Sequence, residues 1–110
     1  MKSLASRLNK RITVLRAPDP EIDVDEAGQP LDDFIPVAKV WASIEPLRGR
    51  ELFAAQQENV EVTTRIRIRY RKGIDRTMIA RFEDSEFEFL YVIHVNFEKK
   101  ELQIMAKERQ

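Results

Sequence analysis

The sequence predicts an all-β fold class: a small antiparallel β-barrel of about six strands with one short helix and a long acidic loop. Six segments alternate apolar and polar residues with the period of two that is typical of strands. The last four segments follow one another with short polar turns and no helix between them, which favours antiparallel pairing. Six strands in 110 residues leave exposed sheet edges unless the sheet closes, so a barrel is expected, with a strongly curled sandwich as the alternative.

The chain is expected to form a single domain over residues 1–110, because this length supports one hydrophobic core. Its first strand is predicted at residues 10–16, KRITVLR, with Ile12 and Val14 on one side. Residues 17–33, APDPEIDVDEAGQPLDD, hold three prolines and one glycine without a usable period. They predict a flexible, exposed acidic loop, and loops of this length in compact domains are usually functional or disordered.

The next two elements are a strand at residues 34–45 and a short helix. Pro36 lacks a backbone donor, which indicates an edge or a bulge at the start of this strand. Trp41 is the single tryptophan and is expected in the core. A proline and a glycine end the strand, and RELFAAQQ at residues 50–57 is rich in helix formers. The apolar side of this helix is predicted to cover one open end of the barrel with Leu52, Phe53 and Ala55.

Four further strands are predicted at residues 60–71, 76–83, 86–97 and 101–109. The turn residues KGID follow the first of them, and Asp84 and Ser85 follow the second. The third alternates through Phe87, Phe89, Tyr91, Ile93, Val95 and Phe97. The fourth alternates through Leu102, Ile104 and Ala106. Each strand would turn its apolar set toward the core.

The composition excludes several classes of function. Lys plus Arg and Asp plus Glu both number 19, so the total charge gives no argument for nucleic acid or an anionic membrane. The chain has no cysteine, which excludes disulfides, thiolate metal sites and a cysteine nucleophile. It shows neither a signal-peptide pattern nor an apolar run of about 18 residues, and it is expected to be soluble and intracellular at synthesis.

The charge is unevenly distributed along the chain. Residues 17–38 contain seven acids and no lysine or arginine. Removing these seven from the 19 acids leaves 12 against 19 bases, so the rest of the chain carries an excess of seven positive charges. The seven acids are Asp19, Glu21, Asp23, Asp25, Glu26, Asp32 and Asp33.

The stretch TTRIRIRYRKGID, residues 63–75, places an arginine at every second position, at Arg65, Arg67, Arg69 and Arg71. On a strand, this arginine stripe would extend along about 20 Å of one face and could follow a phosphate backbone. No aromatic ring is interleaved on that face, since Tyr70 has the opposite parity. The favoured alternative is a solvated or interface face whose arginines pair with carboxylates such as Glu83, Glu86 or Glu88.

No catalytic, cofactor or metal site is predicted, and no enzymatic activity is expected. Asp23, Asp25 and Gly28 match three positions of a calcium loop, but alanine and phenylalanine stand at two of its other ligand positions. His94, the single histidine, lacks a second histidine or a cysteine beside it and a nucleophile placed by a known motif. It is expected to be packed or partly exposed structure.

Several motifs, taken in order, resemble the head-tail joining, or head-tail adaptor, family of tailed phages and prophages. They are WASIEPLRGRELFAAQQ, TTRIRIRYRKGID, a strand carrying Met78, a long strand ending in Asn96, and ELQIMAKE. The shared residues are Trp41, Leu47, Gly49, Arg50, Glu51, Ala55, Thr64, Arg69, Tyr70, Gly73 and Ile74. The resemblance covers about residues 7–108, and the combination at these spacings is fairly specific.

The resemblance implies a structural protein of the virion neck, with a small β-barrel, a short central helix and long loops. Such proteins assemble as a ring under the portal or its adaptor, close the DNA-filled head and present a surface to the tail. The implied partners are further copies of the chain, the portal or adaptor complex, tail proteins and nearby DNA in the neck channel, without a membrane. Assembly would take place in the bacterial host cytoplasm. Residues 17–33 are the candidate for a loop that obstructs the channel.

A mechanism of assembly follows as a hypothesis: the acidic loop of one subunit lies against the arginine face of the next subunit, or of the portal. The predicted interface consists of Arg65, Arg67, Arg69 and Arg71 with Asp19, Glu21, Asp23, Asp25, Glu26, Asp32 and Asp33. The alternative function is a small β-barrel nucleic-acid-binding protein that uses the same arginine face directly.

Overall fold

The described part of the chain contains six strands and one helix, as the all-β class predicts. The computed structural model describes residues 7–95 and 99–109. The strands are β1 (Lys10–Arg16), β2 (Ile35–Pro46), β3 (Thr64–Arg69), β4 (Ile79–Phe82), β5 (Ser85–His94) and β6 (Glu101–Arg109), and the helix is α2 (Gly49–Glu58). No helix within these two ranges is long and apolar enough to cross a membrane.

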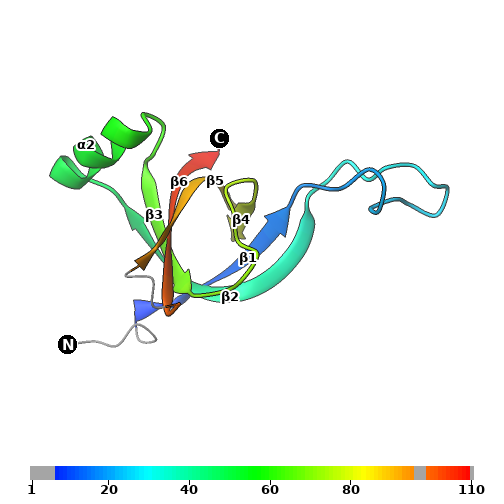
Figure 1. The fold of residues 1–110 in the computed structure, drawn as a ribbon, viewed down its shortest axis with the longest axis horizontal. Helices are drawn as coiled ribbons and strands as arrows, with labels where there is room; N and C mark the ends of the chain where they lie inside the picture. Colours follow the sequence, from blue (N-terminus) through cyan, green and yellow to red (C-terminus); the bar gives the residue numbers. More distant parts are fainter. Residues whose placement is uncertain (1–6, 96–98, 110) are drawn as a thin grey trace.

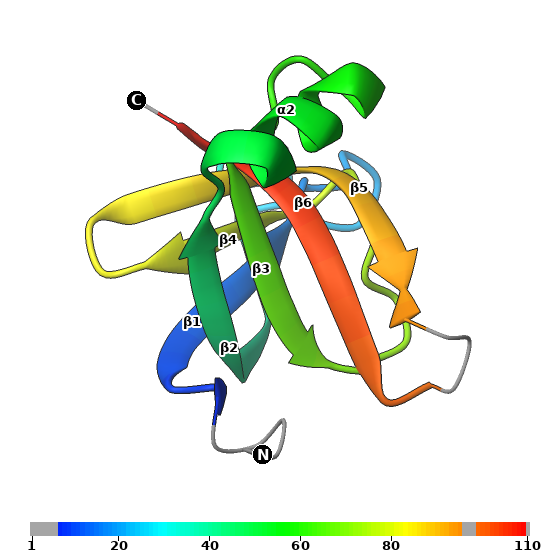
Figure 2. The ribbon, with the colours of Figure 1, turned by 90° about the vertical axis from the view of Figure 1, so that its left-hand side faces the viewer.

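The strands form one closed barrel in the order β1-β2-β3-β6-β5-β4, and β4 pairs back with β1. Every pairing is antiparallel. Figure 2 shows the strands curving around a common axis, with α2 outside their ring. Closure gives each described strand two neighbours, although the short β4 pairs with β1 only over residues 13–15 and with β5 only over residues 85–88.

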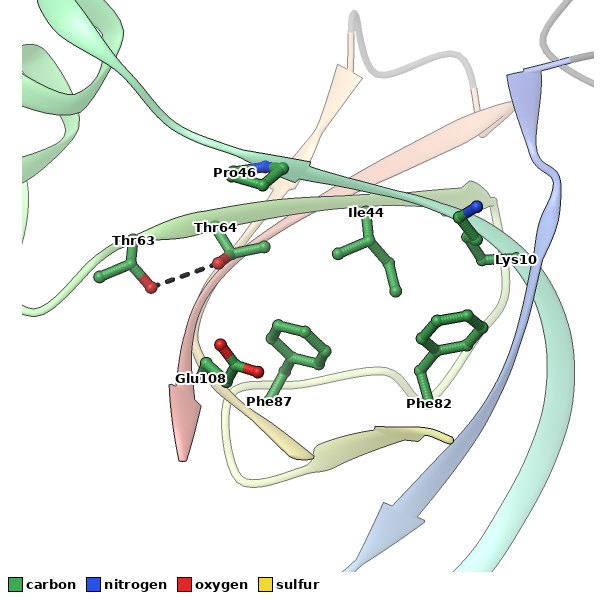
Figure 3. A pocket seen from close by; sticks show the side chains of 8 residues that line it. All are labelled: Lys10, Ile44, Pro46, Thr63, Thr64, Phe82, Phe87 and Glu108. Atoms are coloured by element: carbon green, nitrogen blue, oxygen red, sulfur yellow. Dashed lines mark hydrogen bonds between the residues drawn. The ribbon is translucent and has the colours of Figure 1, made fainter. Parts of the chain in front are cut away.

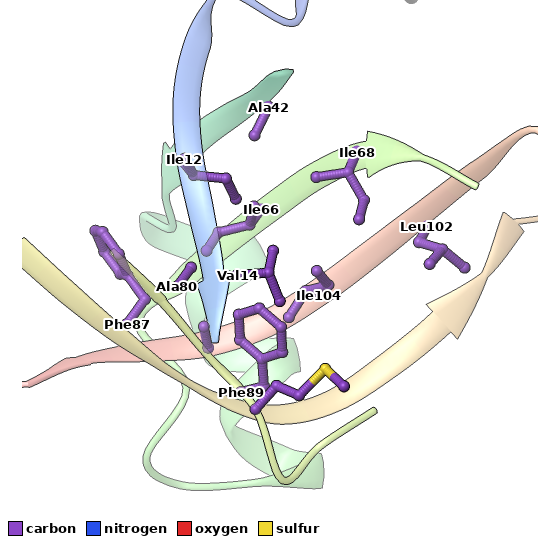
Figure 4. Packing of buried hydrophobic residues seen from close by; sticks show 12 residues of the cluster. Ile12, Val14, Ala42, Ile66, Ile68, Ala80, Phe87, Phe89, Leu102 and Ile104 are labelled. Carbon is purple, nitrogen blue, oxygen red and sulfur yellow. The ribbon is translucent and has the colours of Figure 1, made fainter. Parts of the chain in front are cut away.

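The barrel interior is filled by the apolar side chains that the alternation placed on the inward face (Figure 4). Ile66 and Ile68 of β3 are fully buried, while the arginines that alternate with them face outward. The interior cluster also includes Ile12, Val14, Ala42, Ala80, Phe87, Phe89, Leu102, Ile104 and Ala106. The predicted inward faces of β1, β3 and β6 are therefore confirmed.

Two β-bulges change the side-chain parity within strands. The first lies on β2, where Val37 is the extra residue between Pro36, opposite Leu15, and Ala38, opposite Val14, so that the neighbouring Pro36 and Val37 are both exposed. The second lies between Phe89 and Tyr91, so Tyr91 leaves the inward face. For this reason the alternation predicted for the strand at residues 86–97, which is β5, is wrong beyond Phe89. Ile93, which was expected on the same side as Phe89, is exposed. Phe97, and the Asn96 of the resemblance, lie outside the described residues.

Two strands begin later than predicted because side chains organise turns before them. Asn59 accepts hydrogen bonds from the backbone of Glu61 and Val62, through its side chain and its carbonyl respectively, and β3 starts at Thr64. Asp75 accepts a 2.9 Å hydrogen bond from the backbone N–H of Thr77, and β4 starts only at Ile79. Asx-type turns therefore replace the first residues of both predicted strands.

Helix α2 packs on the outer wall of the barrel and does not close its end, which corrects the prediction. Its buried Ala55 contacts a second apolar cluster with Leu47, Val62 and Met105. Met105 has the opposite parity to the inward Ile104, so this cluster lies outside the barrel wall. Phe53 was expected on the packed side of the helix but is 70% exposed.

Candidate functional site

The arginine stripe is divided into a paired half and an unpaired half. Arg67 donates hydrogen bonds from Nε to Glu45 at 2.7 Å and from Nη1 to Glu101 at 3.3 Å. Arg65 forms ion pairs with Glu45 at 3.3 Å and with Glu51 of α2 at 3.5 Å. The sequence predicted intramolecular pairing of this kind as one alternative, but it named other carboxylates.

The strand order determines which carboxylates are available. Strand β3 lies between β2 and β6, so Glu45 and Glu101 flank the arginines, whereas Glu86 and Glu88 lie on β5 and pair with Arg81, Arg109 and Lys107. Partial burial alone would raise the pKa of Glu45, but the Ser43 hydroxyl and the guanidiniums of Arg67 and Arg65 hold that pKa below its usual value. Burial likewise works against the charged Arg67, while Glu45 and Glu101 raise its pKa. The paired half of the stripe thus stabilises the barrel wall.

Arg69 and Arg71 form the other half of the stripe, and both are exposed. Arg69 is the last residue of β3, so Arg71 lies beyond the strand and the predicted four-residue row on one strand is wrong at that position. Within residues 7–95 and 99–109, neither guanidinium has a hydrogen bond or an ion pair. Their charge remains available at the surface.

These two arginines share a surface hollow of about 280 Å³ with residues from β1 and β2. We call it the basic-aromatic patch, and its side chains are Arg11, Lys39, Val40, Trp41, Arg69, Tyr70 and Arg71. The patch holds four cationic groups and no carboxylate. Tyr70 also lies beside the exposed His94, with ring centroids 6.1 Å apart.

Trp41 lies at the surface of this patch and is 52% exposed, so its expected place in the core is wrong. The guanidinium carbon of Arg11 lies 5.2 Å from the centroid of the Trp41 ring, a cation–π contact. The alternation of β2 contained the signal for this position, because Trp41 shares parity with the exposed Lys39 and opposes the buried Ala42. The sequence reasoning therefore missed an aromatic ring beside the unpaired arginines.

The acidic loop, residues 17–33, is a hairpin with its own hydrogen bonds. Val24 and Pro30 form an isolated antiparallel bridge, and Leu31 donates a backbone hydrogen bond to Asp23. Asp25 Oδ1 accepts backbone hydrogen bonds from Ala27 and Gln29 at 2.9 and 2.8 Å. The loop is thus organised locally, and Figure 1 shows it extending from the barrel at the end of the long axis opposite α2.

Asp23 anchors the hairpin to the barrel. Its carboxylate accepts two hydrogen bonds from Arg16, the last residue of β1, at 2.6 and 2.9 Å, and one from the backbone of Asp19 at 2.7 Å. The hydrogen bond from Arg16 and that from Asp19 lower the pKa of Asp23 to about 2. The carboxylate of Asp23 is therefore used to hold the hairpin against β1. In the described chain, no group of three acidic or histidine side chains could hold a metal ion.

The outer surface of the hairpin combines negative charge with apolar side chains. Glu21, Asp25, Glu26, Asp32 and Asp33 are exposed. Ile22 is 74% exposed, and Val24 and Leu31 are 41% and 39% exposed. Among the described residues, the only ion pair of the hairpin joins Asp23 to Arg16. The loop and the arginine stripe, which the sequence placed in one interface, do not meet within one chain.

A second hollow opens at the end of the barrel opposite the hairpin (Figure 3). It measures about 440 Å³, and its apolar wall is formed by Ile44, Phe82 and Phe87. Lys10 and Glu108 lie at its rim, at the start of β1 and near the end of β6. The sequence did not predict this opening, because α2 was expected to cover one end of the barrel.

Comparison with known proteins gives a family match and similar solved structures. A family model for phage head completion proteins matches residues 4–109. The solution structure of protein SF1141 from Shigella flexneri 2a is similar, with a TM-score of 0.70 and 23% identity over 96% of both chains. A chain from the virion of a native gene transfer agent particle is similar with a TM-score of 0.53 and 20% identity, over 90% of this chain and 94% of that one. At these identities the two structures show a shared fold. A search of curated proteins found no match.

Proposed function

The chain belongs to the phage head completion protein family, and from this membership we propose that it is a structural protein of the virion neck that joins the DNA-filled head to the tail. The observation that carries the proposal is the family match, which extends over residues 4–109 and so covers the barrel, the helix and the hairpin together. A head–tail structural role follows from the family.

We propose that the protein acts as a ring on the portal or its adaptor. The closed barrel leaves little strand edge free, so contacts between copies are expected to use mainly loops and side chains. The two strongly charged regions, the hairpin and the arginine stripe, lie on different parts of the surface, which suits a head-to-tail contact between unlike faces. Such heterologous contacts close into rings when the rotation between subunits allows.

The hairpin is the proposed element for closing the DNA channel. It projects beyond the barrel, giving the molecule extents of 52 × 29 × 27 Å. Its acids would repel the DNA backbone in a channel, which favours a role as a gate over a role as a DNA-binding loop. The remaining partners in this proposal are tail proteins on the opposite face, with assembly in the bacterial host cytoplasm.

A nucleic-acid-binding function is the second candidate, and one observation favours it. The basic-aromatic patch places Trp41 beside Arg11 and Arg69, which is the combination of ring and cation that single-stranded nucleic acid can use. Such a protein would bind an oligonucleotide by itself, with an affinity that falls steeply as the salt concentration rises.

The experiment that tests the leading proposal is in vitro joining. Heads produced without this protein are mixed with tails, with and without the purified chain, and joined particles are counted by electron microscopy. We expect joined particles only when the chain is present. Efficient joining in its absence would refute the neck function, and salt-sensitive binding of the free chain to oligonucleotides would favour the second candidate.

A further inference from the structure

Two surface regions of this protein carry opposite charges, and most of these charged side chains have no partner within the described chain. The basic-aromatic patch has the cations of Arg69, Arg71 and Lys39 without an ion pair among the described residues, next to the half-exposed ring of Trp41. The hairpin has exposed acids next to exposed aliphatic side chains, of which Ile22 is 74% exposed. Each region combines charge with apolar surface, and the signs are complementary.

The two regions cannot meet within one chain. The hairpin begins after Arg16, at the end of β1, whereas Arg11 of the patch lies five residues earlier, which corresponds to about 17 Å along the strand. The hairpin also points away from the barrel, as Figure 1 shows. A contact between them therefore requires a second copy of the chain.

We propose that the hairpin of one copy, residues 17–33, docks on the basic-aromatic patch of the neighbouring copy. The proposal rests on the proposed ring and names the contact that would form it. Glu21 and Glu26 would pair with the unpaired cations, and Ile22 would cover the exposed ring of Trp41. Arg65 and Arg67 are left out of this contact, because their guanidiniums already bind Glu45, Glu51 and Glu101.

Another copy fits the patch better than DNA does. A phosphate backbone would satisfy the cations but would leave the exposed Ile22, Val24 and Leu31 of the hairpin without a role. Docking of the hairpin would pair the cations of the patch and also cover the exposed aliphatic side chains of the hairpin. The exposed surface of one hairpin is small, and contacts of this size are weak, so pairs of copies would form on a template and not in dilute solution.

Cysteine cross-linking tests the contact directly, because the natural chain has no cysteine. Copies with Glu26→Cys are mixed with copies carrying Lys39→Cys, bound to heads and oxidised. Mixtures of Glu26→Cys with Gln57→Cys, an exposed position on α2, serve as the matched control. We expect disulfide-linked dimers from the Lys39 mixture at a yield about tenfold above the control, since docking raises the effective concentration of the two thiols.

Charge reversal supplies the second arm of the experiment. Arg69→Glu with Arg71→Glu should abolish the cross-link, and Glu21→Lys in the partner copy should restore part of it, because opposite charges again face each other. Heads that are joined to tails normally while cross-linking stays at the control level would overturn the docking proposal and leave the neck function intact. The docking proposal would also be overturned if the Arg69→Glu, Arg71→Glu variant loses binding to oligonucleotides but still joins heads to tails. That result would identify the patch as a nucleic-acid surface.

Discussion

Glu45 and Arg67 face each other across neighbouring strands, and Arg67 Nε donates a 2.7 Å hydrogen bond to Glu45 Oε2. Arg69, two residues further along β3, has no such partner among the described residues. One row of arginines therefore has two uses. Its first half ties β2, β3 and β6 together, and its second half is available to a partner.

Arg67→Ala should destabilise the fold by about 2 kcal/mol, because it leaves Glu101 without its guanidinium partner and Glu45 with Arg65 alone. The side chain of Glu101 is only 12% exposed, so water replaces the lost ion pair poorly. The free energy of unfolding is measured by chemical denaturation. Arg69→Ala is the matched control, and its effect should be within about 0.5 kcal/mol because this side chain is exposed. Equal losses from both variants would contradict the division of the stripe.

Phe89→Ala should reduce the stability by about 3–5 kcal/mol, since it removes a large side chain from the barrel interior. Phe89 is 2% exposed and belongs to the interior cluster. Phe53→Ala, at a position that is 70% exposed on α2, should have little effect on thermal or chemical unfolding. A large loss for Phe53→Ala in the isolated chain would mean that α2 packs differently from the structure described above.

Much of the fold could be predicted from the sequence, because side-chain alternation depends on local geometry. Ile66 and Ile68 are buried and Arg65 and Arg67 face outward, as the period of two requires. The bulge at Leu90 could not be predicted, since the extra residue is inserted by the pairing of β5 with β6. The position of α2 outside the wall depends on the outward-facing Met105, which packs against Ala55 of the helix.

The site could be predicted only in part, because ion pairing depends on strand order. The arginines of the stripe were found from spacing alone, but their partners Glu45 and Glu101 are identified only once β3 is known to lie between β2 and β6. Trp41 was assigned to the core from its residue type, although its parity with Lys39 indicates the surface. Parity is the better guide when the two conflict in a strand.

Gly73→Ala should cost about 1 kcal/mol of stability through the backbone alone. Gly73 adopts φ +85° in the turn between β3 and β4, and no heavy atom lies within 4 Å of the position that an alanine Cβ would occupy. Gly73→Asn should cost less, because asparagine tolerates positive φ better than alanine does. Denaturation midpoints of the two variants give the comparison, and the reverse order would show that the turn changes conformation on substitution.

Asp23 should titrate with a pKa of about 2, well below its ordinary value of 3.8. Because folding lowers this pKa, the ionised carboxylate stabilises the hairpin above about pH 4, and the stabilisation is lost as the pH falls through about 2. Carboxyl chemical shifts measured by NMR during acid titration report this pKa. Arg16→Ala should raise it toward the ordinary value, since the hydrogen bond from Arg16 is the largest cause of the shift, while the backbone N–H of Asp19 should keep it from reaching that value. An Asp23 that titrates near 3.8 in the unmodified chain would show that the hairpin is not anchored to β1 by this ion pair.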